Sequence, residues 1–299
     1  MTMRRSGTAG FSLVEVMAAI AILGIAMTAV FSTFLFQQQS YTTQARVSEM
    51  QQDLRDAMEM LSRDIRMCTY GIPSTVNIVD NEITTRFLKS VNSASGPDEI
   101  TVLYRYDGDA AYPSDNVTLA AGATTVTLTS TAGIVAGDRI LVYNATNADL
   151  RKVTAVSASP ATLTFGVGLT NDYSAGGTLA RVRYARYYVD NSTGQPTLML
   201  DKRNGQPAQP LADGIEDLQL VYRMDTDANG TVDLDNNVAG NASFVRQVRV
   251  YLLARSRITE KGWIDTGDRN MADHSPGAAN DGYRRRRTEM VLDVRNSSF

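Results

Sequence analysis

The sequence predicts an α+β protein: a long N-terminal helix packs on an antiparallel β-sheet head, and the head carries an inserted small all-β module. Three observations predict this class. An apolar run over 11–36 continues without a proline into a one-sided helical pattern that ends near residue 69. Short β-rich runs separated by turn residues fill the remainder of the chain. Between about 111 and 180 the composition shifts toward Ala, Thr, Val and Gly, which marks the module.

The apolar run is long enough to cross a membrane, and its only ionisable side chain is Glu15. Its residues would form a helix of about 39 Å, which exceeds the roughly 30 Å of a hydrocarbon core. Arg4 and Arg5 precede the run, so the positive-inside rule predicts one pass with the long remainder of the chain beyond the membrane. A cleaved signal peptide would have a shorter apolar region and a small-residue cleavage site. A plain anchor would leave Glu15 unexplained, because carboxylates within membranes are costly and usually paired.

The apolar positions then continue at spacings of three and four residues, which predicts one helix over 11–69 ended by Gly71 and Pro73. The stripe consists of Val47, Met50, Leu54, Ala57, Met58, Leu61 and Ile65. Charged residues between them predict a solvated opposite face: Arg46, Glu49, Asp53, Arg55, Asp56, Glu59, Arg63 and Asp64. A simple anchor needs no such continuation, so the length of the predicted helix favours the spine of a filament.

The start of the chain resembles the signal of type IV prepilins and type II secretion pseudopilins, because a short basic leader is followed by Gly10-Phe11-Ser12-Leu13-Val14-Glu15. The resemblance implies a leader over 1–10, which prepilin peptidase removes between Gly10 and Phe11. It also implies N-methylation of Phe11. In this family the carboxylate equivalent to Glu15 meets the positive N-terminal amine of a neighbouring subunit during assembly.

Short runs of strand-forming residues predict the sheet of the head, which we assign to 70–110 and 181–299. The predicted strands are 99–106, 116–119, 124–130, 138–143, 151–156, 161–165, 178–189, 197–203, 218–224, 244–254 and 289–294. Residues 190–194 predict a hairpin turn. The even strands within 111–180 predict a small barrel or sandwich. The alternative is that they extend one continuous sheet.

Four stretches of the head resemble PilW-type minor pilins and, more loosely, the J-type pseudopilin of type II secretion. They are 211–218 leading into Val221-Tyr222, the acidic turn after it, 245–253 and the closing 294–296. The resemblance implies a type IV pilin fold and a non-enzymatic minor pilin that helps initiate or cap a type IV pilus. Its implied partners are prepilin peptidase, other minor pilins, the major pilin and the bacterial inner membrane, with the head in the periplasm and later in the pilus. The alternatives are a J-type pseudopilin and a membrane-anchored periplasmic enzyme or binding module. Roles in motility or cell adhesion remain compatible with a pilus subunit.

The acidic segment 225–233 has oxygen-bearing side chains at alternate positions and a glycine at its sixth position, a spacing similar to that of a calcium loop. The predicted Ca²⁺ donors are the side chains of Asp225, Asp227, Asn229 and Asp233 and the Thr231 carbonyl. The twelfth loop position is Asn236 rather than a bidentate Glu. The alternative is an acidic hairpin in which Asn229-Gly230 supply positive φ.

Composition excludes several classes of site. The 29 basic and 32 acidic residues give a net charge of −3, so wholesale binding to nucleic acid is not expected. One cysteine and one histidine exclude an intramolecular disulfide, a thiolate cluster and a multi-histidine metal site. No nucleophile motif, phosphate loop or dinucleotide fingerprint is present, and we expect no enzyme activity.

Three remaining features receive structural interpretations. The arginine run 284–287 enters a strand, where its side chains alternate between faces, and it is interpreted as ion-paired. His274 is interpreted as a solvated loop residue without an evident partner. Cys68 is interpreted as a partly buried thiol near the helix end, and the alternative is a disulfide with another subunit.

Overall fold

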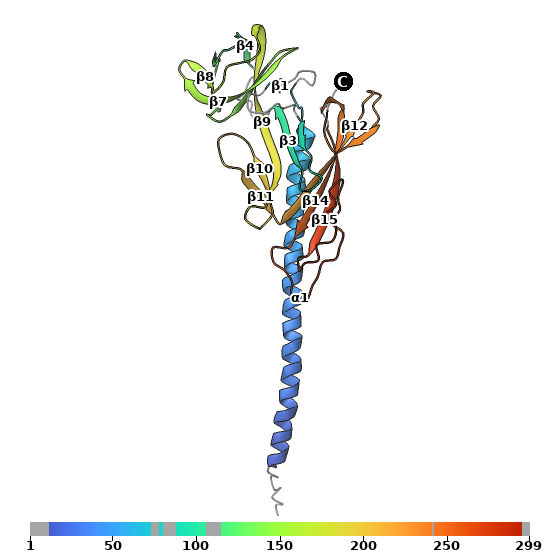
Figure 1. The fold of residues 1–299 in the computed structure, drawn as a ribbon. Coiled ribbons are helices and arrows are strands. Elements are labelled where there is room, and N and C mark those ends of the chain that lie inside the picture. The colour runs from blue at the N-terminus through green and yellow to red at the C-terminus, as the bar shows by residue number, and fades with distance from the viewer. Residues whose placement is uncertain (1–11, 73–77, 80–87, 106–114, 241, 295–299) are drawn as a thin grey trace, which may run out of the picture. The chain divides into compact units, whose positions relative to one another are not determined.

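The computed structural model describes residues 12–72, 78–79, 88–105, 115–240 and 242–294 (Figure 1). The chain divides into two compact units, Met1–Glu49 and Met50–Phe299. The predicted leader 1–10 and the predicted cleavage site at Gly10 and Phe11 lie outside the described residues.

The predicted long helix is confirmed as α1 (Leu13–Met67), whose 55 residues would measure about 80 Å at 1.5 Å per residue. Hydroxyl side chains within its apolar part donate hydrogen bonds to backbone carbonyls of the preceding turn of the helix. Thr28 Oγ1 donates to the Gly24 carbonyl at 2.7 Å, and Thr33 Oγ1 donates to the Ala29 carbonyl at 2.9 Å. The helix therefore continues through these positions without a break.

The second unit begins within α1, where one stripe of the helix is buried. The predicted apolar positions from Met50 to Ile65 are all buried. The helix ends where Thr69 and Gly71 adopt positive φ, and the Thr69 amide donates to the Leu103 carbonyl at 3.1 Å. A Cβ at position 71 would lie 2.8 Å from the Arg105 side chain, so glycine is required at this turn.

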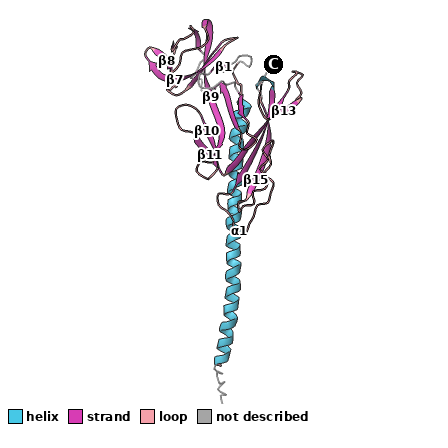
Figure 2. Cartoon of the chain, in the orientation of Figure 1, coloured by secondary structure: helices cyan, strands magenta, loops and turns pink. Residues whose placement is uncertain are grey.

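The head contains two β-sheets (Figure 2). The larger sheet has eleven strands, and its main path runs β11-β10-β9-β6-β7-β8-β5. Its strands are β1 (Ile78–Val79), β2 (Leu88–Val91), β3 (Glu99–Arg105), β4 (Asp115–Leu119), β5 (Thr125–Thr127), β6 (Arg139–Tyr143), β7 (Ala148–Ala158), β8 (Ala161–Phe165), β9 (Tyr173–Asp190), β10 (Thr197–Asp201) and β11 (Gln209–Asp213). The strands pair antiparallel except for a short parallel contact between β1 and β7.

The smaller sheet has the order β13-β12-β14-β15 and is antiparallel throughout. Its strands are β12 (Ile215–Met224), β13 (Leu234–Asn236), β14 (Val245–Arg255) and β15 (Arg285–Asp293), and a short 3-10 helix, η1 (Ala242–Phe244), precedes β14. Each predicted β-rich run contains a strand, and the hairpin at 190–194 joins β9 to β10. The short strands β1, β2, β11 and β13 are not predicted by the sequence.

The region 111–180 has features both of a separate small barrel or sandwich and of an extension of one continuous sheet. Its buried apolar side chains, which all lie between Val117 and Leu179, form a hydrophobic cluster of their own. Strand β9 nevertheless continues from this cluster into the remainder of the head, and the sheet path is unbroken from β11 to β5. The boundaries of an inserted module therefore stay a prediction.

Candidate functional site

The first unit presents a helical surface of apolar side chains that are exposed in the described part of the chain. Leu13, Ile25 and Phe36 are among many large apolar side chains that are exposed in this part of α1. The helix is long and apolar enough to span a membrane by length and composition. Such a surface requires either lipid or other apolar helices around it.

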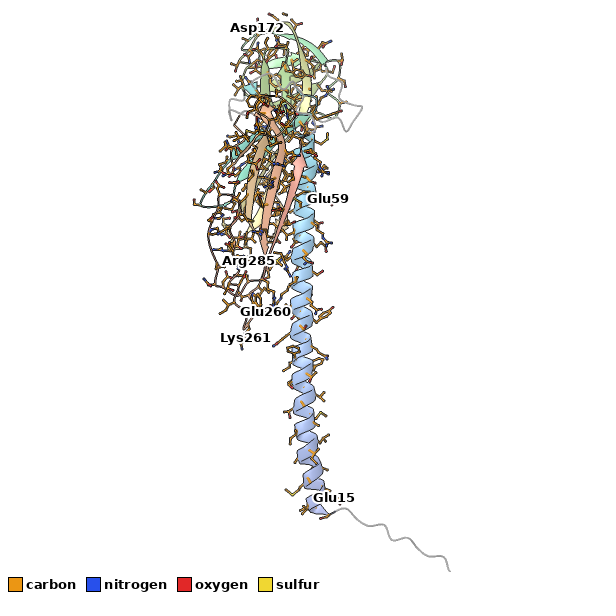
Figure 3. All side chains as sticks on the ribbon, turned by 90° about the vertical axis from the view of Figure 1, so that its right-hand side faces the viewer. Glu15, Glu59, Asp172, Glu260, Lys261 and Arg285 are labelled. Carbon is orange, nitrogen blue, oxygen red and sulfur yellow. The ribbon has the colours of Figure 1, made fainter. Side chains whose placement is uncertain are left out.

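Glu15 is the acidic residue of the first turn of this helix, and its side chain projects from the helix start (Figure 3). The Glu15 amide donates to the Ser12 carbonyl at 3.0 Å, so the residue belongs to the first hydrogen-bonded turn. Gly10 and Phe11, which the sequence analysis places at the processing site, lie outside the described residues. The arrangement places one carboxylate near the end of an otherwise apolar surface.

The second half of α1 holds a buried carboxylate that the sequence analysis places on the solvated face. Asp64 is fully buried, and it accepts hydrogen bonds from the Tyr104 hydroxyl at 2.9 Å and the Tyr187 hydroxyl at 2.6 Å. Arg183 on β9 lies 3.5 Å from the same carboxylate. Burial and the Asp64 carboxylate both raise the pKa of the two tyrosines, which remain donors. Asp64 therefore ties the helix to β3 and β9.

The predicted calcium loop connects β12 to β13 and gathers the expected carboxylates. Oxygens of Asp225, Asp227 and Asp233 lie within 4.8 Å of one another. Asn229 Oδ1 accepts hydrogen bonds from the Thr231 amide and hydroxyl. Positive φ occurs at Ala228 and Gly230 rather than at Asn229. The loop thus collects hard oxygen atoms of the kind that Ca²⁺ prefers.

Asp225 already accepts hydrogen bonds from two amides of the loop and from Arg246 on β14. Its carboxylate accepts from the Asn229 amide at 3.1 Å, the Gly230 amide at 3.0 Å and Arg246 Nε at 3.2 Å. Burial opposes ionisation, but the hydrogen bonds from Arg246 and the Gly230 amide lower the pKa of Asp225. A bound cation would compete with the Arg246 guanidinium for this carboxylate.

The arginine run is divided between paired and exposed residues. Arg284 pairs with Glu260 and lies over the Trp263 ring at 4.0 Å. Arg285 reaches Glu216 at 2.6 Å and Asp281 at 2.6 Å, and its side chain is buried. The prediction of an ion-paired strand is confirmed for these two residues.

The interpretation of His274 is wrong. Its Nδ1 lies 2.7 Å from Asp217 Oδ2, and the ring is mostly buried. Because the partner is 57 residues away on β12, local sequence carried no signal for it. Nearby Asp98, which precedes β3, accepts hydrogen bonds from the Ser93 and Leu220 amides. Burial raises the pKa of Asp98 to about 6, and the charges of Asp273 and Asp217 add to this shift.

Cys68 is fully buried rather than partly buried. Burial raises the pKa of its thiol to about 12. The side chain therefore serves as a small apolar group of the core.

Comparisons with known proteins give two family matches. A family described as Type IV Pilus-assembly protein W matches residues 186–296, and a Prokaryotic N-terminal methylation motif matches residues 5–31. The chain matches no curated protein. Among solved structures it is similar to a type IV-like pilin, TTHA1219, from Thermus thermophilus, at 15% identity and a TM-score of 0.39, over 83% of this chain and 96% of that chain.

The family matches fall on the segments that carry the resemblance stated above. The methylation motif implies processing by a peptidase and assembly with other pilus components. Together with the apolar first part of α1, it is consistent with anchoring in a membrane. The PilW family consists of structural rather than enzymatic proteins.

Proposed function

We propose that the chain is a type IV pilus minor pilin of the PilW family and that it helps to initiate or cap pilus assembly. The two family matches, one at the N-terminal helix and one in the head, support this proposal. Prepilin peptidase cleaves after Gly10, and the helix stores the subunit in the inner membrane with the head in the periplasm. The subunit then enters the pilus with other minor pilins and the major pilin through lateral packing of its helix.

The observation that carries this proposal is the uncovered apolar surface of the first unit. An α-helix satisfies its backbone hydrogen bonds internally. Because the side chains of this part of α1 are apolar on all sides, the helix is stable both in lipid and in a bundle of similar helices. Exchange between these two environments requires no refolding of the helix. The same helix can therefore serve first as an anchor and then as a filament core.

The Glu15 carboxylate favours the association of helices over an isolated helix in lipid. An unpaired carboxylate in an apolar environment costs several kcal/mol, and an adjacent positive charge offsets much of that cost. After cleavage, the amine of Phe11 in a neighbouring subunit is such a charge. Pairing of the two groups favours subunits that have met a partner.

The experiment replaces Glu15 in cells that lack the native gene. We expect Glu15→Ala to reduce sheared surface pili by about tenfold or more, because the neighbour's amine loses its counter-charge. Glu15→Asp, which keeps the charge, restores part of the assembly. The head of Glu15→Ala should unfold at the wild-type midpoint, and Asp172→Ala, an exposed carboxylate of the head, should assemble normally. Normal piliation by Glu15→Ala would contradict the charge-pairing step.

Processing is tested by the mass and N-terminal residue of the protein from membranes and from sheared filaments. We expect a methylated Phe11 start in the filament fraction and block of processing when Gly10 is replaced by a larger residue. An intact Met1 confined to the membrane would contradict processing and assembly together.

We also propose that the loop 225–233 binds Ca²⁺ through Asp225, Asp227, Asn229, Asp233 and the Thr231 carbonyl. The gathered carboxylates support the ion, and the competing Arg246 implies weak binding. We expect 5 mM CaCl₂ to raise the unfolding midpoint by about 2–5 °C over a chelator control. The double variant Asp227→Asn, Asp233→Asn should lose this rise, whereas Asp172→Asn should keep it. An unchanged wild-type midpoint would contradict the site.

A further inference from the structure

Strand β15 forms one edge of the smaller sheet. It pairs with β14 along one side from Arg285 to Asp293. Among the described residues no strand pairs with its other side. An edge strand presents backbone N–H and C=O groups that can pair with a strand of another chain.

An open groove separates this edge from the second half of α1 within the same unit. Its volume is about 510 Å³, and its apolar floor is formed by Leu54, Met58 and Met290. Met290 on β15 is 39% exposed although its apolar side chain faces the helix residues across the groove. Two positions further along the strand, Leu292 is fully buried and does not line the groove. The geometry offers an apolar strip beside an unpaired strand edge.

The groove is strongly basic. Arg55 and Arg66 line it from the helix, Arg286 and Arg287 line it from β15, and Glu59 is the one acidic residue of the lining. Arg287 Nη1 also donates to the Asn270 carbonyl at 3.2 Å. Figure 3 places Glu59 on the helix and Arg285 on the strand. Within the described part of the chain, no carboxylate lies within 4.0 Å of these four guanidinium groups, whereas Arg284 and Arg285 of the same run are paired. Uncompensated positive charge selects a negatively charged occupant.

Protection of the edge against aggregation is the competing explanation, because charged residues on an edge strand deter unwanted pairing. Protection of an edge requires charged residues only on the edge strand itself. Here the helix adds two further arginines, and the space between them has an apolar floor. Charge on both walls and an apolar base are features of a site that receives a chain segment.

We propose that the groove binds an extended segment of a partner protein that mixes acidic and apolar residues, and that this segment adds as a fifth strand along β15. Its backbone pairs with the free edge of β15, an apolar side chain lies beside Met290, and its carboxylates meet the four arginines. This inference deepens the proposed function, on which it rests, by naming the surface and the chemistry of an assembly partner.

The test uses the full chain in detergent and a fluorescent nine-residue peptide in which Glu alternates with Val. We expect saturable binding by fluorescence anisotropy, weakened by raised salt as Coulomb attraction is screened. Arg286→Glu with Arg287→Glu should weaken binding by about tenfold or more. Lys261→Glu, at an exposed loop position outside the groove, is the matched control and should bind like the wild type.

Two further peptides separate strand addition from simple charge attraction. The same peptide with N-methyl groups on two adjacent central amides cannot pair along either edge, and we expect it to lose most of its binding. A peptide of alternating Lys and Val should not bind. A photoreactive group at the peptide centre should crosslink to β15 or to residues 51–66. Equal binding of the N-methylated peptide, wild-type binding by the arginine double variant, or crosslinks elsewhere would overturn the proposal.

The two proposals fail separately. Loss of pili in Glu15→Ala together with absent peptide binding would leave the minor pilin function intact and remove the groove as a docking site. Peptide binding together with normal piliation in Glu15→Ala would support the groove and remove the charge-pairing step.

Discussion

The two halves of α1 have similar apolar side chains but opposite surroundings. From Leu13 to Phe36 the large apolar residues are exposed on all sides. From Met50 to Ile65 the apolar residues form one stripe, and the head of the same chain buries it. The first half contributes little to the stability of the monomer, because apolar side chains stabilise the folded state when folding removes them from water. It remains available for lipid or for other subunits, whereas the second half belongs to the core of the head.

This difference separates residues of assembly from residues of folding. A change in the first half should alter what the molecule associates with, and a change in the second half should alter whether the head folds. Substitutions in each half, and in the head that packs on the second half, test this separation.

The largest effect is expected at Asp64. Asp64→Ala removes the acceptor of the Tyr104 and Tyr187 hydroxyls and the carboxylate that lies 3.5 Å from Arg183. We expect the free energy of unfolding to fall by about 3–5 kcal/mol in denaturant titration of the full chain in detergent. Asp56→Ala, which removes an exposed carboxylate of the same helix, should change it by less than about 0.5 kcal/mol. Equal effects of both variants would show that the buried cluster does not hold the helix to the sheet.

A pair of leucines tests the two halves directly. Leu61 is fully buried, whereas Leu23 is 59% exposed. We expect Leu61→Ala to lower the free energy of unfolding of the head by about 2–4 kcal/mol through a cavity. Leu23→Ala should leave it within about 0.5 kcal/mol of the wild type. A comparable loss from Leu23→Ala would mean that the first half stabilises the head.

The pH dependence of the free energy of unfolding should reflect the titration of Asp98. The head buries this carboxylate, whereas Glu15 in the first half of α1 is exposed. Burial raises the pKa of Asp98 from 3.8 to about 6, so the folded state holds the proton more tightly than the unfolded state. The stabilisation is complete below about pH 4 and is lost as the pH rises through about 6. Relative to the non-titrating Asp98→Asn, the wild type should therefore lose up to about 2–3 kcal/mol between pH 4 and pH 7. A difference that does not vary with pH would place Asp98 in a solvated site.

The smallest effect concerns the reactivity of Cys68 at the end of the buried half. Its raised pKa and full burial predict that a thiol reagent such as Ellman's reagent labels less than about 10% of the native protein at pH 8. Unfolding in guanidinium should expose one reactive thiol per chain. Ser192→Cys, in an exposed turn, is the positive control and should react at once. Rapid labelling of native Cys68 would contradict its place in the core.

Much of the fold was predictable because it rests on local patterns. The 3.6-residue period, the absence of proline before Pro73 and the turn residues near 71 define α1. Alternating β-rich runs define most strands. The unpredicted β1, β2 and β13 have two to four residues, and β11 contains Pro210, which weakens a strand pattern. The sequence analysis places Asp64 on the solvated face of the helix, but the structure buries it. Helical spacing predicts which residues share a face, whereas the width of the face that the sheet buries depends on contacts such as that of Tyr187 with Asp64.

The candidate sites divide in the same way. The apolar run with Glu15 and the alternating oxygens at 225–233 are each formed by neighbouring residues of the chain. The sequence alone therefore predicts an N-terminal helix that requires an apolar environment and a loop rich in carboxylates. The tertiary structure brings His274 to Asp217 and pairs Arg285 with Glu216 and Asp281. It also places Arg286 and Arg287 along a groove shared with the helix. These arrangements join residues far apart in the chain, and whether a charge is paired or free depends on packing that no local pattern records.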